Sequence, residues 1–199
     1  MTLINFFDGT KDPKYGRALL RSFQEIEKYQ PLTVSAIPGQ TDIPGYNLVK
    51  GLESRAYNPQ RNQVHRRSLL QELLFNSGQN LEGQKSFILT EADLYDDNLK
   101  WCFGAANGDY KGGSHIILST RRFNGPKTLA HVAIHEFGHM FGAASQGRRN
   151  TEMNLGSHCT NLCVMQQKLI VSEMEAQARR IANRENKFCY DCQTELRYR

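Results

Sequence analysis

Two histidines flank a glutamate in the segment His135-Glu136-Phe137-Gly138-His139. On an α-helix, side chains at positions i and i+4 project from the same face, so His135 and His139 can converge on one metal ion. Imidazole pairs at this spacing are typical zinc ligands, and Glu136 is placed to act as the base toward a water molecule held by that zinc. The pattern predicts a catalytic zinc site; an ordinary amphipathic helix with two surface histidines is the alternative.

A glycine at position 142 extends this pattern to H-E-x-x-H-x-x-G. Gly142 allows the helix to stop and the chain to turn sharply under the metal. The extended segment resembles the start of the metzincin signature, in which a third histidine stands three residues after the glycine. Ser145 occupies that position here. Because serine is a poor zinc ligand, a third ligand is expected from elsewhere in the chain.

A histidine, four cysteines and a methionine follow in an order that is similar to the archaemetzincins, a small family of metzincin-like zinc peptidases. The order is His158-Cys159, Cys163, Met165, Cys189 and Cys192. The resemblance implies that His158 is the third ligand of the catalytic zinc and that Met165 forms the methionine turn, an apolar floor below the histidines. It also implies that residues 145–157 are an insertion that loops out before the third ligand, at little extra closure entropy.

Segments upstream of the histidines extend the resemblance over about two thirds of the chain. They are residues 62–73, 87–95, 101–105 and 116–123. The fold that the resemblance implies is an α/β (α+β-like) metzincin-type catalytic domain, with a mixed twisted sheet packed against helices and an active-site helix. We therefore expect one domain over residues 1–199, with a C-terminal four-cysteine zinc segment at 159–192.

The four cysteines also form two closely spaced pairs, Cys159 with Cys163 and Cys189 with Cys192. Such pairs can hold a closed structural zinc with four sulfur ligands, which has no position for water. Two disulfides or free buried thiols are the alternatives, and disulfides require an oxidising compartment. The sequence favours two zinc ions per chain, one catalytic and one structural.

The N-terminal residues carry no visible export signal, since the stretch 1–7 is short, lacks a basic start and is followed by Asp8. We therefore expect a cytoplasmic location. The fifth cysteine, Cys102, stands between Trp101 and Phe103 and is expected to be a small buried hydrophobic residue.

The remaining histidines and two glutamates are weaker candidates. His131 shares a helix face with His135 but lies two turns, about 12 Å, from His139, so it is expected at the surface or behind the ligands. His65 and His115 are expected to be solvated. Glu173 and Glu175 offer a carboxylate as an alternative third ligand, although the cysteine order favours the histidine.

The elements that must position these residues follow from periodicity and breakers. Strands are predicted near residues 2–7, 86–91 and 114–120, and helices near 13–29, 61–75, 127–141 and 166–185. Residues 30–60, with several prolines and glycines, are predicted to be irregular or to form short strands. In the family resemblance, the strand at 114–120 is the sheet edge that pairs with an extended peptide.

Composition limits the classes of partner. With 199 residues, of which 39% are hydrophobic, the chain can bury one full core, and no apolar run approaches membrane-spanning length. The net charge of +5 comes with scattered arginine pairs rather than a dense basic block, so a solvated surface is favoured over nucleic-acid binding.

Two functions remain open at this point. The first is a zinc metallopeptidase, of endopeptidase or aminopeptidase type, that hydrolyses a peptide or protein substrate with a zinc-bound water activated by Glu136. The alternative is a catalytically weak or inactive peptidase-like binding protein that keeps only the four-cysteine zinc. The sequence assigns no substrate-binding residue and no oligomeric state.

Overall fold

The computed structural model describes residues 2–37, 44–76, 81, 83–110 and 113–197. These residues form two compact units, each with contributions from two separate parts of the chain. Of the described residues, those between 2 and 17 and between 33 and 122 form one unit, and those between 18 and 32 and between 123 and 197 form the other. Each unit is described separately below.

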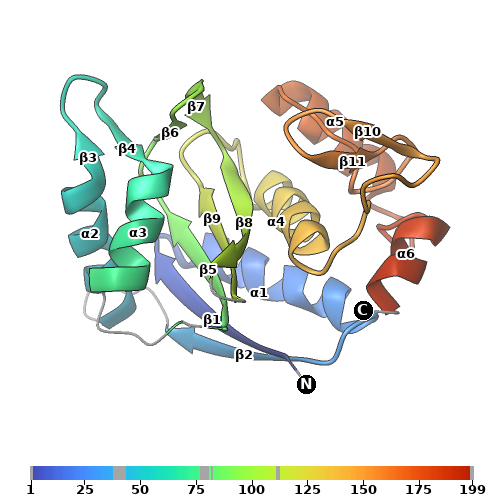
Figure 1. Cartoon of the computed structure of the whole chain (residues 1–199), viewed down its shortest axis with the longest axis horizontal. Helices are drawn as coiled ribbons and strands as arrows, with labels where there is room; N and C mark the ends of the chain where they lie inside the picture. The colour runs from blue at the N-terminus through green and yellow to red at the C-terminus, as the bar shows by residue number, and fades with distance from the viewer. Residues whose placement is uncertain (1, 38–43, 77–80, 82, 111–112, 198–199) are drawn as a thin grey trace. The chain divides into compact units, whose positions relative to one another are not determined.

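The first unit is built on a five-stranded sheet in the order β2-β1-β5-β9-β8 (Figure 1). The strands β1, β5 and β9 run parallel, and β8 is antiparallel to β9. Their residues in the middle of the sheet, such as Ile88 and Ile117, are fully buried, which explains the nearly continuous apolar runs of these strands. The bounds are Thr2–Gly9 for β1, Leu32–Ile37 for β2, Lys85–Thr90 for β5, Gly104–Tyr110 for β8 and Gly113–Ser119 for β9.

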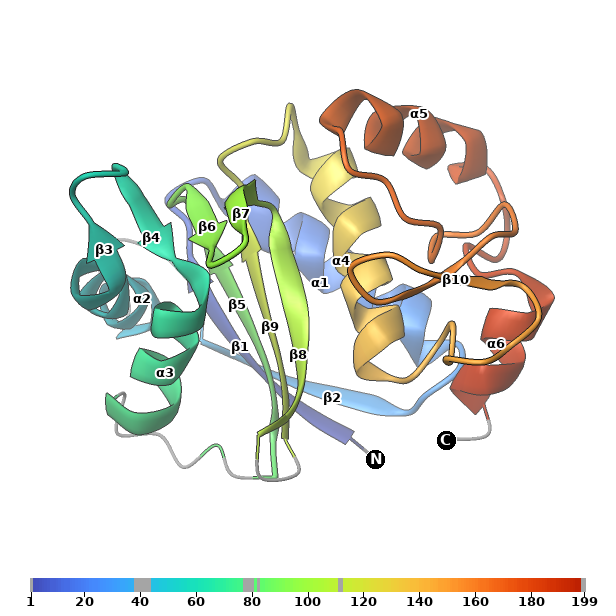
Figure 2. The ribbon, with the colours of Figure 1, turned by 45° about the horizontal axis from the view of Figure 1, so that its top comes forward.

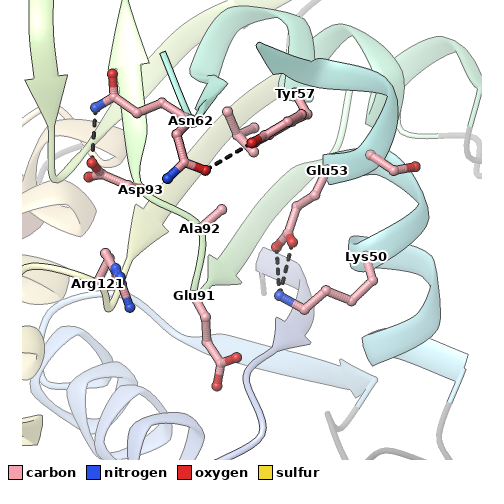
Figure 3. Close-up of a pocket in the computed structure, with 11 residues that line it drawn as sticks. Lys50, Glu53, Tyr57, Asn62, Glu91, Ala92, Asp93 and Arg121 are labelled. Carbon is pink, nitrogen blue, oxygen red and sulfur yellow. Dashed lines mark hydrogen bonds and ion pairs between the residues drawn. The ribbon is translucent and has the colours of Figure 1, made fainter. Parts of the chain in front are cut away.

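Two helices, α2 (Pro44–Ala56) and α3 (Arg66–Asn76), cover one face of this sheet (Figure 2). A smaller sheet, with its strands in the order β3-β4-β6-β7, belongs to the same unit. Its strands are Tyr57–Asn58, Gln63–His65, Leu94–Asp96 and Leu99–Cys102. Between α2, β4 and the segment after β5 lies a polar hollow of about 550 Å³ (Figure 3).

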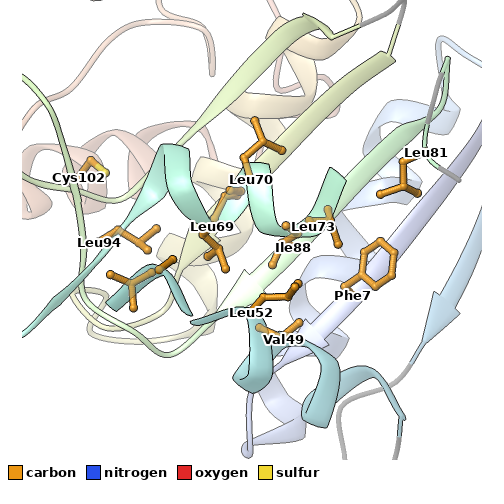
Figure 4. Packing of buried hydrophobic residues seen from close by; sticks show 13 residues of the cluster. Phe7, Val49, Leu52, Leu69, Leu70, Leu73, Leu81, Ile88, Leu94 and Cys102 are labelled. Carbon is orange, nitrogen blue, oxygen red and sulfur yellow. The ribbon is translucent and has the colours of Figure 1, made fainter. Parts of the chain in front are cut away.

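The core of this unit lies between the large sheet and the two helices (Figure 4). Phe7, Ile88 and Ile117 occupy neighbouring register positions on β1, β5 and β9, and they meet Leu52 and Leu73 of the helices. Each fully buried side chain of this size stabilises the fold by about 1.5–3 kcal/mol relative to an exposed one. Cys102 is also buried in this cluster, as predicted.

The second unit is mostly helical and contains α4 (Pro126–Met140), α5 (Val171–Ile181), α6 (Tyr190–Arg197) and the part of α1 (Pro13–Glu27) from residue 18 onward. The α1 helix packs on α4 through Phe23 and Phe137, whose ring centroids are 4.5 Å apart. A two-stranded hairpin, β10 (Thr151–Met153) and β11 (Ser157–Cys159), completes the unit. Figure 1 and Figure 2 both show the hairpin and α5 beside α4.

Several predicted elements were wrong in position or kind. Residues 44–56, expected to be irregular, form α2, because Pro44 is at its first turn, where proline is tolerated, and Val49 and Leu52 supply a buried face. The helix expected from residue 61 begins at Arg66, since Gln63–His65 pair as β4. The helix expected at 166–185 spans only Val171–Ile181, and α6 follows it.

The predicted edge strand is also corrected. The strand at 113–119 is β9, which pairs with β5 on one side and with β8 on the other, so β8 is the sheet edge. The mixed α/β class that we predicted is confirmed. Among the described residues, no helix combines the length and apolarity needed to cross a bilayer.

Candidate metal centre

The helix that carries His135 and His139 has a defined beginning and end. Pro126 stands in its first turn, where a missing backbone N–H costs nothing. At the other end Gly142 adopts a φ of 78°, and its N–H donates to the His139 carbonyl oxygen at 3.0 Å. The next N–H, of Ala143, donates to the Gly138 carbonyl oxygen at 2.8 Å. This pair of bonds is a Schellman motif, so the helix stop predicted at Gly142 is confirmed.

Three histidine side chains converge beside this helix. The Nε2 atom of His139 lies 3.1 Å from Nε2 of His135 and 3.3 Å from Nε2 of His158. Zinc binds imidazole nitrogen at about 2.0–2.1 Å in tetrahedral geometry, which places two ligand nitrogens about 3.3 Å apart. The observed separations match this value, so the donor set fits a zinc ion.

Backbone carbonyls fix the tautomers of two of these rings. Nδ1 of His135 lies 2.8 Å from the Val164 carbonyl oxygen, and Nδ1 of His158 lies 3.2 Å from the Gly156 carbonyl oxygen. A carbonyl oxygen only accepts, so each Nδ1 carries the proton and each Nε2 presents its lone pair. Both lone pairs therefore face the space shared with His139.

Burial keeps the three imidazoles neutral. It lowers the pKa of His139 to about 2 and that of His158 to about 4, with the neighbouring histidine rings adding to the effect, and it also lowers the pKa of His135. Neutral imidazole is the form that binds a metal, so no proton needs to be displaced at pH 7. Glu136, the candidate base, is partly buried on the same helix.

The segment 145–157, which the family resemblance implies to be an insertion, does not form an open loop. Its second half, with the residues that follow, folds into the β10–β11 hairpin, in which Glu152 pairs with His158 and Thr151 with Cys159. The hairpin turns through Leu155 and Gly156, which have φ values of 52° and 126°. His158 therefore reaches the other two histidines from a strand, although it is 19 positions after His139 in the sequence.

The predicted methionine turn lies against α4, which carries His135 and His139 and is called the metal helix below. Met165 is fully buried, and a Cβ atom added at Gly138 would lie 2.1 Å from its Sδ atom. A side chain at position 138 would overlap the sulfur, so Met165 or the helix would have to shift. The Met165 carbonyl oxygen also accepts from the Cys159 N–H at 3.0 Å, which joins the turn to the strand that carries His158.

The four cysteines meet in a second cluster. The sulfur atoms of Cys159, Cys163, Cys189 and Cys192 lie within 4.8 Å of one another, and all are free thiols. Cys159 and Cys189 are separated by 3.6 Å between their Sγ atoms, close to the about 3.8 Å expected for two thiolates on one tetrahedral zinc. Hydrogen bonds from Cys159 and the other two thiols hold the pKa of Cys189 well below its usual range. The cluster fits a closed metal site.

Two of the weaker histidine predictions were wrong. His115 is fully buried on β9 rather than solvated, and burial, with the nearby Lys85 cation, lowers its pKa to about 4. His65 is partly buried, with Nδ1 2.8 Å from Ser68 Oγ. Sequence periodicity could not separate these cases, because burial at either position depends on distant elements.

The alternative carboxylate ligands stay away from the histidines. Glu173 is exposed on α5, and Glu175 accepts a hydrogen bond from Asn124. His131, expected at the surface or behind the ligands, is buried and lies 3.2 Å from Gln177 Oε1. Gln177 in turn donates to the Cys163 carbonyl oxygen at 2.7 Å. Gln177 thus links α4 to the methionine turn, a role that no sequence signal indicated.

The polar hollow of the other unit offers a less specific arrangement. Two of its carboxylates are already engaged, Glu53 with Lys50 at 2.9 Å and Asp93 with Gln63 at 3.0 Å, and dashed lines mark these contacts in Figure 3. A further group of potential ligands, His65, Asp96 and Asp97, lies nearby in sequence. Arg66 and Arg67 pair with these two aspartates and compete with any cation. The histidine and cysteine clusters are therefore the stronger metal sites.

Curated proteins and solved structures include relatives of this chain. No family model matches the chain. A curated protein from Nanoarchaeum equitans, named Archaemetzincin, is 30% identical over 141 residues, which are 71% of this chain and 66% of that relative. The chain thus spans about two thirds of the length of the relative that it matches.

Solved structures show the same fold over nearly the whole chain. An archaemetzincin from Archaeoglobus fulgidus, complexed with malonate, gives a TM-score of 0.64 at 20% identity, covering 98% of this chain and 99% of the other. One from Methanopyrus kandleri gives 0.65 at 20% identity, covering 98% and 93%. A zinc-dependent peptidase from Methanocorpusculum labreanum gives 0.61 at 20% identity, covering 98% and 99%. The fold is that of the metzincin-like zinc peptidases. The chain belongs to the archaemetzincin family.

Proposed function

We propose that this protein is a zinc-dependent metallopeptidase that hydrolyses peptide bonds at the site formed by His135, His139 and His158. The observation that carries the proposal is the convergence of the three Nε2 atoms at 3.1 and 3.3 Å, beside a glutamate on the same helix. A set of three neutral imidazoles leaves one tetrahedral position open, which distinguishes a catalytic from a structural zinc. The name of the Methanocorpusculum labreanum neighbour, a zinc-dependent peptidase, supports the same reaction.

The residues of the chain divide the work as follows. The three histidines would hold the ion, which when bound supplies a Lewis acid for the substrate carbonyl and lowers the pKa of a water molecule. Glu136 would accept the proton of the attacking water and later deliver it to the leaving amine. The carbonyls of Val164 and Gly156 keep the ligand rings in the correct tautomer. Met165 supplies the packed floor that prevents the helix from shifting.

The cysteine cluster belongs to the proposal as a second, structural zinc. Four sulfur ligands leave no position for water, so this ion would take no part in the chemistry. Its location between β11 and α6 would staple residues 159–192, within a single domain over 1–199. Free thiols in such a cluster are consistent with a reducing compartment, so the cytoplasm stays part of the proposal.

The alternative, a binding protein that keeps only the four-cysteine zinc, rested on Ser145 in place of the third histidine. The hairpin supplies His158 to the same group and so weakens that argument. The direct test is zinc content per chain together with hydrolysis of a quenched fluorescent peptide. Two zinc ions and turnover that disappears in Glu136→Gln support the proposal; one zinc ion and no turnover in the wild type contradict it.

The same assay separates the two types of peptidase. An endopeptidase cleaves an N-acetylated peptide, whereas an aminopeptidase requires a free α-amino group. Aminoacyl substrates with and without an N-acetyl group, compared at equal concentration, would therefore assign the type. A peptide or protein is the substrate class in either case.

A further inference from the structure

Ser145, which stands where the metzincin signature has its third histidine, contacts a carboxylate instead. Ser145 and the residue before it surround the carboxylate of Glu195, on α6. One carboxylate oxygen accepts from the Ala144 N–H at 2.7 Å, and the other accepts from the Ser145 N–H at 3.0 Å and from the Ser145 hydroxyl. Ala144 has a φ of 57°, a conformation that is rare for a residue with a side chain. Successive N–H groups in this conformation form a concave anion site, which here holds the carboxylate.

The same carboxylate also binds an arginine of the inserted segment. Arg148 Nη1 lies 2.8 Å from Glu195 Oε2, and the two side chains are each only 15% exposed. Arg148 Nη2 lies 3.3 Å from Cys192 Sγ. Arg148 therefore contacts both the carboxylate and the sulfur cluster. A zinc ion with four thiolates carries a net negative charge, so a cation at this place is favourable.

A second pair of residues fixes the same segment nearer to the hairpin. Asn150 donates from Nδ2 to Asp191 of α6 at 3.2 Å, and its carbonyl oxygen accepts from the Thr160 N–H at 3.0 Å. The residues on either side of the hairpin are thus joined to each other and to α6. The α6 helix also carries Cys192, and Cys189 stands just before it.

We propose that Glu195 and Arg148 are positioning residues that couple the four-cysteine site to the histidine site. In this view α6, anchored by its cysteines, holds the turn at 144–148 and thereby sets the place of β11 and of His158. The proposal rests on the proposed function, because it concerns the affinity of the histidine site for its metal. It gives a physical means by which a ligand 19 positions after His139 is held beside the helix.

The size of the effect follows from the contacts that are lost. Glu195→Ala removes the carboxylate that accepts from Ala144, Ser145 and Arg148, and it leaves Arg148 with Cys192 but without its buried carboxylate partner. Removal of a group that orients a metal ligand lowers the metal affinity by about 10–100-fold. We expect the histidine site of Glu195→Ala to bind metal at least about 10-fold more weakly, while the cysteine site, whose ligands are intact, changes much less.

Cobalt(II) titration of the metal-free protein measures the two sites separately. Thiolate ligands give an intense near-ultraviolet charge-transfer band, whereas an imidazole site gives only weak visible bands. Competition with a chelator of known affinity then yields a dissociation constant for each site. Retention of the charge-transfer band at its normal intensity shows that the variant is folded around the cysteines. The matched control is Glu173→Gln, which removes the same charge from an exposed position on α5.

The outcomes are distinct. A weakened histidine site with an unchanged cysteine site in Glu195→Ala, and wild-type values in the control, support the coupling. Equal histidine-site affinity in wild type and variant overturns it while leaving the proposed function standing. A wild type that fills only the cysteine site overturns both. If Glu195→Ala does not fold, Arg148→Gln removes one arm of the clamp, and an unchanged histidine site in that variant overturns the proposal.

Discussion

Substitution of Gly138 by alanine gives the sharpest test of the packing beneath the metal helix. In a helix interior, this exchange by itself stabilises a protein by about 0.5–1 kcal/mol, because alanine restricts the unfolded chain. At this position, however, the added Cβ would lie 2.1 Å from Met165 Sδ and 3.0 Å from Phe188 Cε1. Both of these side chains are fully buried, so neither can move into solvent.

The steric cost determines whether Gly138→Ala raises or lowers the free energy of unfolding. Overpacking of a close-packed core costs about 1–3 kcal/mol, and a contact this short falls at the upper end of that range. After subtraction of the helix-propensity gain, we expect Gly138→Ala to lose about 1–2 kcal/mol of unfolding free energy. For a chain of this length that corresponds to a decrease in Tm of about 3–6 °C. Because Met165 is joined to Cys159, zinc retention is expected to fall as well.

The assay is urea unfolding at fixed free zinc, which keeps metal linkage constant. Gly51→Ala, in the middle of α2, is the matched control, since an added Cβ there meets only the tip of Arg55 at 3.8 Å. It should stabilise the protein by about 0.5–1 kcal/mol. A Gly138→Ala variant as stable as the Gly51→Ala variant would refute the packing argument.

Three further outcomes are expected. Glu136→Gln should lower peptide turnover at least about 100-fold with the zinc content unchanged, because only the proton acceptor is lost; loss of zinc would contradict this role. His158→Ala should lower the zinc content from two ions to one, measured by atomic emission, and an unchanged content would exclude it as a ligand. His115 has a folded-state pKa of about 4 against 6.5 unfolded. The stability that goes with burying its neutral imidazole is therefore fully present above pH 6.5 and is lost as the pH falls toward 4. Between pH 7 and pH 5 we expect a loss of about 2 kcal/mol that His115→Leu removes; an equal pH dependence in both proteins would be inconsistent with it.

The metal helix and its immediate ligands could be predicted from local sequence. A period of 3.6 residues places His135 and His139 on one face whatever surrounds them, and Gly142 ends the helix because it alone adopts the required φ without strain. The order of His158, the cysteines and Met165 indicated the family, and the structure brings His158 to the other two histidines and gathers the four cysteines in a second cluster. Their roles as ligands stay predictions until metal is measured.

Long-range contacts could not be predicted in the same way. The burial of His115 depends on neighbouring strands β5 and β8, and its position in a strand-like run said nothing about its partners. The helix α2 was missed because prolines and glycines suggested a loop, while its buried face is defined only by packing on the sheet. The edge of the sheet was misplaced for a related reason, since strand order is a property of the whole topology.

The sequence by itself therefore determined the kind of chemistry: the spacing of two histidines and a glutamate on a helix, and a set of thiols able to hold a second ion. Only the tertiary structure decided how His158 reaches the other two histidines, through a hairpin whose preceding turn, with Arg148, contacts Glu195 of the distant helix α6. The reason is physical. Helix geometry repeats within a few residues, whereas a ligand that arrives across 19 positions is placed by contacts that the intervening sequence does not encode locally.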